Sequence, residues 1–216
     1  MKRQVKLFDP VIDDNELRAL ERILKGKSWA DGSGSKQVRK FEEEFQKETN
    51  SDSSIAVNSG TAALYLALSM ENIQNKEVIL PSMSFVSTAH AIIANKAKPR
   101  FADIDLDTLC IDPEEIEESL SKSTRIILPV HFGGLPSDLK RIEKICHRNH
   151  LTLIEDAAHA AGASYDGKKI GSHGKFVCFS FHPVKNLAMP TGGLISINDK
   201  NYKHISEKLR AKRWCG

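Results

Sequence analysis

Short apolar runs alternate with longer amphipathic stretches from about residue 50 to the end of the chain. Runs rich in Ile, Leu and Val predict strands, and apolar residues that recur every three or four positions predict helices. The runs that predict strands are 55–57, 77–80, 100–102, 125–129, 151–154, 175–181 and 194–198. Because helical stretches separate them, we expect an α/β fold, with one open, mostly parallel, seven-stranded sheet and helices on both faces.

The stretches with helical spacing run through the whole chain, and the first of them stands apart. They are 13–25, 36–49, 62–70, 84–95, 136–149 and 200–212, and Asp112-Pro113 marks the start of a further short helix. Acidic residues in the first turn support the helix over 13–25, and a Gly/Ser-rich loop follows it from 26 to 35. We therefore expect an N-terminal helix and loop over 1–35 and one large domain over 36–216.

Composition excludes several classes of partner. The chain of 216 residues is 40% hydrophobic and 27% charged, as is usual for a globular protein, and its net charge of +3 is too small to indicate nucleic acid. Its densest basic run, 208–213, has helical spacing and no interleaved aromatic residues, so we interpret it as a solvated helix face. No apolar run approaches the roughly 20 residues that cross a bilayer, and the basic N-terminus precedes no apolar core. We expect a cytoplasmic protein without a membrane partner.

The cysteines predict neither disulfides nor a metal site. Cys110, Cys146, Cys178 and Cys215 are widely spaced and form no CxxC pair. Three of them lie in or beside apolar stretches, which is typical of reduced thiols in the cytosol. We therefore expect no bound zinc or other metal.

A turn of small residues follows the strand over 55–57. Asn58-Ser59-Gly60-Thr61 lies directly before a helix, where backbone N–H groups without partners form a ready anion site. The alternative is a plain helix cap, since Ser and Thr are good caps, and the turn alone favours neither. The sequence has neither the lysine of a P-loop nor a dinucleotide fingerprint at this point.

An acidic segment, Glu155-Asp156-Ala157-Ala158-His159, follows the strand over 151–154. Open α/β sheets place their ligands at the carboxyl ends of strands, so Asp156 is a candidate ligand-binding group. The alternatives are that Asp156 only accepts hydrogen bonds within its loop, and that His159 is an ordinary core histidine.

A lysine lies in the loop between the last two strands. The strand over 175–181 is stopped by Pro183, and Lys185 follows, with Leu187, Ala188 and Met189 after it. A solvated surface lysine is the ordinary interpretation. Apolar surroundings would instead disfavour the ammonium form, lower the pKa and leave a free amine that can form a Schiff base.

Phe85 follows the strand over 77–80, at the start of a predicted helix. This position allows its ring to stack on an aromatic cofactor, and core packing is the alternative. Together the four segments supply what pyridoxal 5'-phosphate (PLP) requires. Its phosphate needs a helix N-terminus, its aldehyde a lysine, and its pyridine nitrogen a carboxylate that keeps the ring an electron sink.

Five segments, in this order, resemble the DegT/DnrJ/StrS family of nucleotide-sugar aminotransferases. They are NSGTAALYLAL, LPSMSFVSTAHAI, LPVHFGG, IEDAAHAAGASYDGKKIGSHGKFVCFSFHPVKN and TGGLISI. The resemblance covers the chain from about Leu7, and the segments EDAAH and FSFHPVKN are the most specific. It implies the aspartate-aminotransferase fold, with a PLP-binding large domain, here 36–216.

The resemblance also implies a role for each matching residue. Lys185 would be the Schiff-base lysine, Asp156 the partner of the pyridine nitrogen, and His159 a neighbour of the cofactor ring near its phenolic oxygen. Gly60 and Thr61 would bind the phosphate. The hydroxyl of Ser180 would assist at the phosphate, and Phe85 would stack on the ring.

The implied reaction is amino transfer, typically from glutamate, to a keto group of a nucleotide-linked sugar in cell-surface polysaccharide or amino-sugar biosynthesis. Members are usually homodimers. Some relatives are dehydratases with a histidine in place of the lysine, so Lys185 favours transfer.

The stretch 213–216 resembles the turn that leads out of the large domain, so we expect the C-terminal small domain to be absent. The alternative is a truncated, non-catalytic PLP-fold protein that serves as a binding or assembly module.

Overall fold

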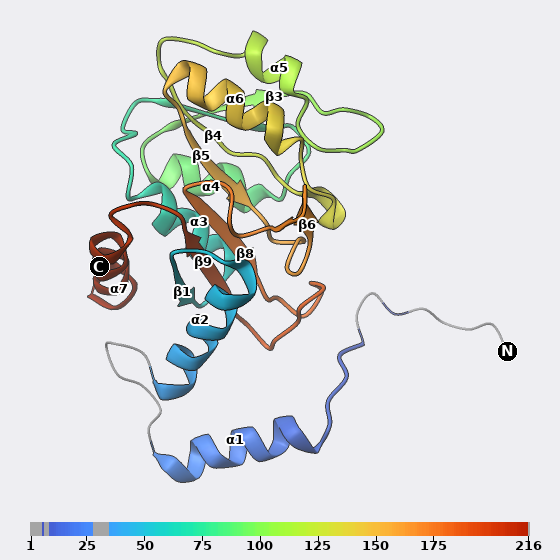
Figure 1. The fold of residues 1–216 in the computed structure, drawn as a ribbon, viewed down its shortest axis with the longest axis vertical. Coiled ribbons are helices and arrows are strands. Elements are labelled where there is room, and N and C mark those ends of the chain that lie inside the picture. Colours follow the sequence, from blue (N-terminus) through green and yellow to red (C-terminus); the bar gives the residue numbers. More distant parts are fainter. Residues whose placement is uncertain (1–5, 7–8, 28–34, 216) are drawn as a thin grey trace, which may run out of the picture.

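A single seven-stranded sheet organises the protein. The computed structural model describes residue 6 and residues 9–27 and 35–215, and Figure 1 shows their arrangement. The sheet has the order β1-β9-β8-β5-β4-β2-β3. Its strands are β1 (Ser53–Val57), β2 (Glu77–Pro81), β3 (Lys98–Ala102), β4 (Thr124–Ile127), β5 (Thr152–Asp156), β8 (Phe176–Ser180) and β9 (Gly193–Ile197). Only β9 runs antiparallel to its neighbours in this sheet, so the predicted mostly parallel sheet is confirmed.

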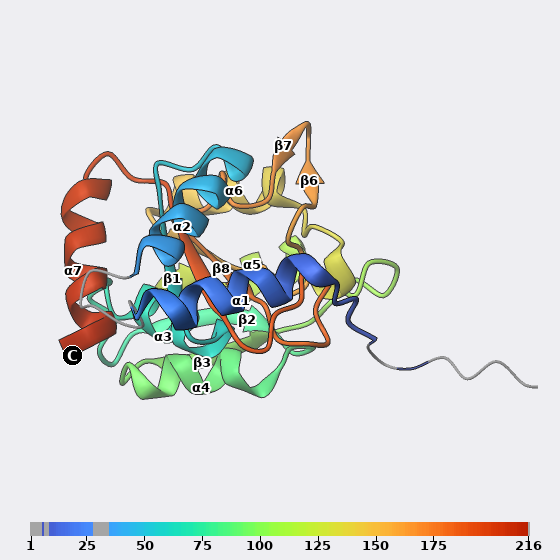
Figure 2. The ribbon, with the colours of Figure 1, turned by 90° about the horizontal axis from the view of Figure 1, so that it is seen from below.

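Helices cover both faces of the sheet, as predicted. The helices that pack on the sheet are α2 (Lys36–Thr49), α3 (Gly60–Leu68), α4 (Val86–Ala94), α5 (Pro113–Glu118), α6 (Leu139–Asn149) and α7 (Tyr202–Cys215), and α1 (Asp14–Gly26) precedes them in the chain. Apolar side chains of α3, α4 and α7 pack on one face, and those of α2, α5 and α6 pack on the other. Figure 2 shows α3 and α4 on the side opposite α2 and α6.

The core lies around the central strands. Strands β8 and β9 are buried along nearly their whole length, because helices cover both of their faces. On the face covered by α2, the ring of Phe179 meets that of Phe45 edge-on, with 4.9 Å between the ring centroids. This packing fixes the end of β8, from which the loop that carries Lys185 departs.

Two element boundaries differ from the sequence prediction by three residues, and the others differ by two or fewer. The helix expected from 136 begins at Leu139, because the side chain of Asp138 caps it by accepting from the backbone N–H of Arg141 at 3.1 Å. Helix α7 continues to Cys215, so most of the stretch interpreted as an exit turn is helical. The structure also adds a short hairpin, β6 (Ser164–Tyr165) with β7 (Lys168–Lys169), whose strands are too short to give a periodic signal.

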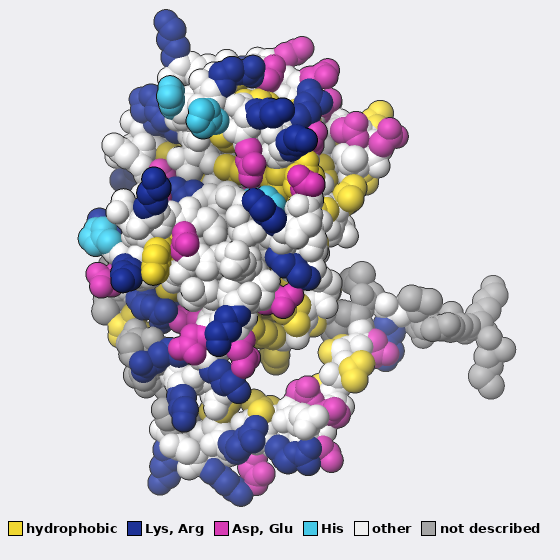
Figure 3. Space-filling view, in the orientation of Figure 1, with side chains coloured by type: hydrophobic (Ala, Val, Ile, Leu, Met, Phe, Trp, Pro, Cys, Tyr) yellow, Lys and Arg dark blue, Asp and Glu magenta, His cyan; other side chains and the backbone are white. Residues whose placement is uncertain are grey.

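The basic run near the end of the chain is only partly solvated. Lys208 and Lys212 are exposed, whereas Arg210 and Arg213 pair with the buried carboxylate of Glu42 at 2.7 and 2.9 Å. These ion pairs join α7 to α2, so the interpretation as a plain solvated face is wrong for the two arginines. Elsewhere on the face in Figure 3, basic and acidic side chains are interspersed.

Helix α1 forms as predicted but lies apart from the sheet in Figure 1. A capping box between Asp13 and Glu16 begins it. None of its residues is buried, and the side chains of Leu17 and Leu20 are exposed. Most of the predicted Gly/Ser loop, residues 28–34, lies outside the described residues. None of the described helices is both long and apolar enough to cross a membrane.

A pair of phenylalanines tests the account of the core. Phe179 is fully buried, whereas 53% of Phe101 is exposed. We expect Phe179→Ala to lower the free energy of unfolding by about 3–5 kcal/mol, because it leaves a cavity. Phe101→Ala should lower it by less than about 1 kcal/mol. Urea unfolding followed by circular dichroism measures both changes, and equal losses would contradict the assignment of the core.

Candidate active site

One cavity lies at the carboxyl ends of β5 and β8, where the N-termini of α3 and α4 approach them. It has a volume of about 260 Å³ and is open to solvent, and clefts of this kind are where proteins usually bind small molecules. The predicted site residues that line it are Gly60, Thr61, Phe85, Asp156, His159, Ser180 and Lys185. Segments more than 120 positions apart in the sequence, such as Gly60 and Lys185, therefore share one cavity.

The N-terminus of α3 forms one wall. Ser59 caps the helix by accepting from the N–H of Ala62 at 3.1 Å, while the first N–H groups, at Gly60 and Thr61, have no acceptor within the helix. A Cβ at Gly60 would lie 2.7 Å from Cβ of Ser180, closer than real Cβ atoms approach. Glycine is thus required for β8 to approach the helix, and the approach places the Ser180 side chain beside this anion-binding terminus.

Asp156 ends β5 and is 4% exposed. Its Oδ2 accepts from the hydroxyl of Thr88 at 2.8 Å, and its Oδ1 accepts from the backbone N–H of Ala158 at 3.1 Å. The sequence analysis did not identify Thr88, which lies in α4 and is completely buried. These two donors hold the carboxylate in one orientation.

His159 lies beside Asp156 in the cavity and is half-buried. Its Nδ1 accepts from the backbone N–H of Gly133 at 3.3 Å, and the ring of Phe132 meets it edge-on. Burial lowers the pKa of His159, as does the charge of Lys185, while Asp156 opposes them. The imidazole is therefore biased toward its neutral form, with the proton on Nε2, since Nδ1 acts as an acceptor.

Lys185 belongs to the loop between β8 and β9 and is also half-buried. Burial lowers its pKa, and the charge of Asp156 opposes that effect. Hydrogen bonds hold this loop in place. The N–H of Lys185 donates to the carbonyl of His182 at 2.8 Å, and the side chain of Asn186 donates to the carbonyl of Ala161. The lysine therefore extends from a held loop into the cavity, which is not the environment of an ordinary surface lysine.

Phe85 precedes α4 as its N-cap residue and is 69% exposed. The alternative of core packing is therefore wrong, and the ring lines the cavity instead.

No group of three or more His, Cys, Asp or Glu side chains that could hold a metal ion occurs among the residues that the structure describes. The cavity brings together a helix N-terminus that can bind an anion, the amine of Lys185 and the exposed ring of Phe85.

Sequence comparison identifies relatives over nearly the whole chain. The DegT/DnrJ/EryC1/StrS aminotransferase family matches residues 10–213. The uncharacterised protein MJ1066 of Methanocaldococcus jannaschii is 40% identical over 210 residues, which are 97% of this chain and 53% of that protein.

Two solved structures show the same fold. 3-Amino-5-hydroxybenzoic acid (AHBA) synthase is 32% identical, with a TM-score of 0.90 over 97% of this chain and 55% of the synthase. DesI, solved in the presence of its TDP-sugar product, is 32% identical, with a TM-score of 0.85 over 95% of this chain and 51% of DesI. The chain thus spans about half the length of these relatives.

Replacement of Thr88 tests its hold on Asp156. We expect Thr88→Val to lower the free energy of unfolding by about 2 kcal/mol, because a buried carboxylate loses a donor. Thr49→Val is the matched control: its buried hydroxyl donates to the neutral carbonyl of Phe45 at 2.9 Å, and its loss should cost about 1 kcal/mol. Urea unfolding at neutral pH measures both, and a smaller effect at Thr88 than at Thr49 would contradict this account. Thr88→Ser should restore most of the stability.

Proposed function

Because the chain belongs to the DegT/DnrJ/EryC1/StrS aminotransferase family, we propose that it carries the PLP-binding part of an enzyme that transfers an amino group to a nucleotide-linked keto sugar. The observation that carries this proposal is that Lys185, Asp156 and the N-terminus of α3 line one cavity. Members of the family are PLP-dependent aminotransferases, and these three features meet the three requirements of that cofactor. The PLP-binding domain would be 36–216, preceded by the helix and loop of 1–35.

We assign the residues of the cavity to the separate groups of PLP. The N–H groups of Gly60 and Thr61 would hold the phosphate, with the hydroxyl of Ser180 beside them. The absence of a side chain at Gly60 supports this assignment, since a Cβ would collide with Ser180. Phe85 would cover a face of the ring with its exposed side chain.

The remaining residues would supply charge and a nucleophile. Asp156 would face the pyridine nitrogen, and the donors from Thr88 and Ala158 hold its carboxylate in one orientation. Lys185 would hold the cofactor through its amine, because burial lowers its pKa and raises the share of free amine at neutral pH. His159, biased toward the neutral form, would donate from Nε2 to the oxygen on the ring.

When bound, PLP supplies an electron sink for the carbon from which a proton is removed. The protein supplies the base. Burial lowers the pKa of Lys185, so its free amine would serve as the base that takes a proton from the carbon bearing the amino group of the donor, and then as the acid that returns a proton. Walls formed by Phe85, Val130 and Phe132 would limit access of water to this amine.

Relatives support the substrate class but leave the acceptor open to test. DesI was solved with a TDP-sugar product, which favours a nucleotide-linked sugar, whereas AHBA synthase is named for an aromatic amino acid. We take glutamate as the amino donor and amino-sugar or cell-surface polysaccharide biosynthesis in the cytoplasm as the setting. Helix α4 begins at the cavity and carries exposed apolar residues, Val86 and Ile93, which suit a homodimer whose interface includes this helix.

Cofactor attachment gives a direct test. The protein mixed with PLP should develop a visible absorption band, and borohydride reduction should leave a phosphopyridoxyl group on Lys185 that peptide mass spectrometry locates. Because the pKa of Lys185 is lowered, we expect this adduct at neutral pH, where an ordinary surface lysine is protonated. Lys185→Ala should abolish the band, while the matched variant at the exposed Lys200, Lys200→Ala, should retain it. A band that persists in Lys185→Ala would contradict the assignment.

Amino transfer gives the test of activity. Glutamate added to the PLP-bound protein should bleach the band, and 2-oxoglutarate should be released once per site. A nucleotide-linked keto sugar should then restore the band, whereas an aromatic keto acceptor should not. Because the chain spans about half of its relatives, the assay is run in parallel on MJ1066 as a full-length control. Bleaching in MJ1066 with none in this chain would favour the alternative of a non-catalytic PLP-binding module.

A further inference from the structure

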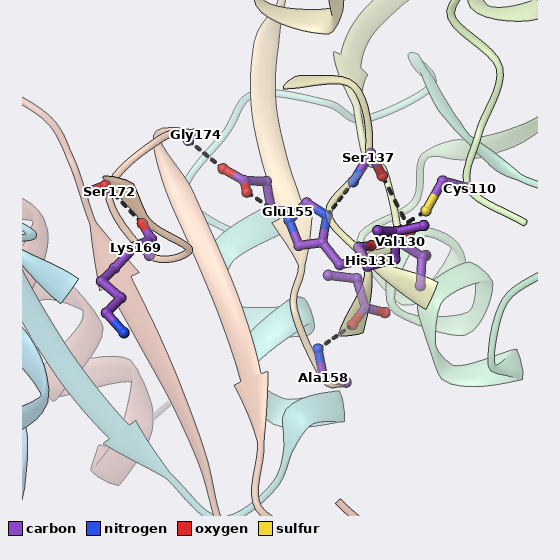
Figure 4. A network of polar contacts seen from close by, with 12 residues as sticks. Cys110, Val130, His131, Ser137, Glu155, Ala158, Lys169, Ser172 and Gly174 are labelled. Atoms are coloured by element: carbon purple, nitrogen blue, oxygen red, sulfur yellow. Dashed lines mark hydrogen bonds and ion pairs between the residues drawn. The ribbon is translucent and has the colours of Figure 1, made fainter. Parts of the chain in front are cut away.

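A buried carboxylate and imidazole lie directly behind the cavity, outside its lining. Glu155 precedes Asp156 in β5, and His131 follows β4; both side chains are completely buried. Figure 4 shows the two side chains pointing toward each other, with Ser137 and Gly174 at the far ends of the network. The functional assignments above give neither residue a task, although burial of a carboxylate without a cation is costly.

The hydrogen bonds of the pair form a continuous chain. The N–H of Ser137 donates to Nδ1 of His131 at 3.1 Å, and Nε2 of His131 lies 2.8 Å from Oε2 of Glu155. The N–H of Gly174 donates to the other carboxylate oxygen. A Cβ at Gly174 would lie 2.7 Å from Oε1 of Glu155, so only glycine allows this approach. Both ring nitrogens of His131 and both carboxylate oxygens of Glu155 therefore have a hydrogen-bond partner.

This chain of bonds fixes the tautomer of His131. Because Nδ1 accepts a backbone N–H, it carries no proton, so the neutral ring has its proton on Nε2 and donates it to Glu155. Glu155 is then an acceptor at both oxygens and remains a carboxylate. No rearrangement of protons within this network preserves all of its bonds.

The network reaches both Asp156 and His159. The backbone N–H of His131 donates to the carbonyl of Asp156 at 3.1 Å, and the N–H of Asp156 donates to the carbonyl of Pro129 at 2.9 Å. The bond from Ser137 to the ring closes the loop 131–137, and within that loop Gly133 donates to His159. The buried pair thus joins the loop 131–137, which donates to His159, to the strand residue that directly precedes Asp156.

We infer that His131 and Glu155 are positioning residues, which set the orientation of His159 and Asp156 toward the cofactor by holding the loop 131–137 against the end of β5. The inference rests on the proposed function for its consequence, since these two cavity groups are the ones assigned to the cofactor ring. A pair with a purely structural role would change stability and leave the properties of His159 unaltered.

Glu155→Gln is the main variant, because it keeps the shape of the side chain and breaks the chain of donors. An amide that turns its NH2 toward His131 meets the Nε2 proton, and one that turns it toward Gly174 meets a backbone N–H. His131→Asn is the second, milder variant, which can still accept from Ser137. Glu42→Gln is the matched control: Glu42 is also a buried carboxylate, but it pairs with the arginines of α7.

The first measurement uses the full chain without added cofactor. Titration of the His159 ring by NMR, assigned with His159→Asn, reports its surroundings: Lys185, Asp156 and the N–H of Gly133 face it. Loss of the Gly133 donor removes a bond that favours the neutral ring, so its midpoint should rise by about half a pH unit or more in Glu155→Gln and His131→Asn. Glu42→Gln should leave the midpoint unchanged at a similar loss of stability. An unchanged midpoint in both network variants would overturn the inference.

The second measurement adds PLP. The network variants should weaken its binding about tenfold, the scale of one hydrogen bond, and shift the pH dependence of the visible band, whereas Glu42→Gln should do neither. If the unaltered protein shows no band, the proposed function fails, and the titration of His159 still decides the positioning role. If the band forms in the unaltered protein and the network variants behave like Glu42→Gln in both measurements, the positioning role fails and the proposed function stands.

Discussion

The carboxylate of Asp156 at the end of β5 is the point on which the rest of the site depends. A buried charge at this position is tolerated because Thr88 and the N–H of Ala158 donate to it, and because the backbone of β5 is bonded on both sides to its neighbours. Its charge in turn opposes the effect of burial on both Lys185 and His159. The charge of Asp156 therefore acts on both the amine and the imidazole of the cavity, so a change at Asp156 should lower the pKa of each.

The fold and the cavity residues follow from local features of the sequence. Strands buried on both faces appear as continuous apolar runs, and each functional residue lies within a few positions of a strand end, so Asp156, Ser180 and Lys185 could be placed at one edge of the sheet from pattern alone. The resemblance to a family added a role for each residue. Those roles stay predictions, whereas their common location in one cavity is a property of the structure.

The residues that the sequence analysis did not identify act through contacts that no local pattern encodes. Thr88 lies 68 positions from Asp156, and its segment looks like an ordinary apolar helix. His131 and Glu155 are 24 positions apart, and each alone is an unremarkable polar residue beside a strand. The start of α6 depends on Asp138 rather than on the preceding proline. In the first two cases a partner distant in the sequence decides the outcome. In the third, the side chain of Asp138 decides at which residue the helix begins.

The reversed direction of β9 determines the order in which the site can assemble. Strands β8 and β9 are sequence neighbours, so the hairpin that presents Lys185 closes only a short loop. The anion-binding terminus of α3 joins it when β1 pairs with β9, and the hydroxyl of Thr191 then reaches the carbonyl of Asn58 across 133 positions. Closure of so long a segment is entropically expensive and slow. The loop that carries Lys185 thus depends on a contact between strands that are close in the sequence, whereas the phosphate-binding residues join it through contacts between segments far apart in the sequence. A partly folded chain with only the first contact would present the lysine but could not retain a phosphorylated cofactor.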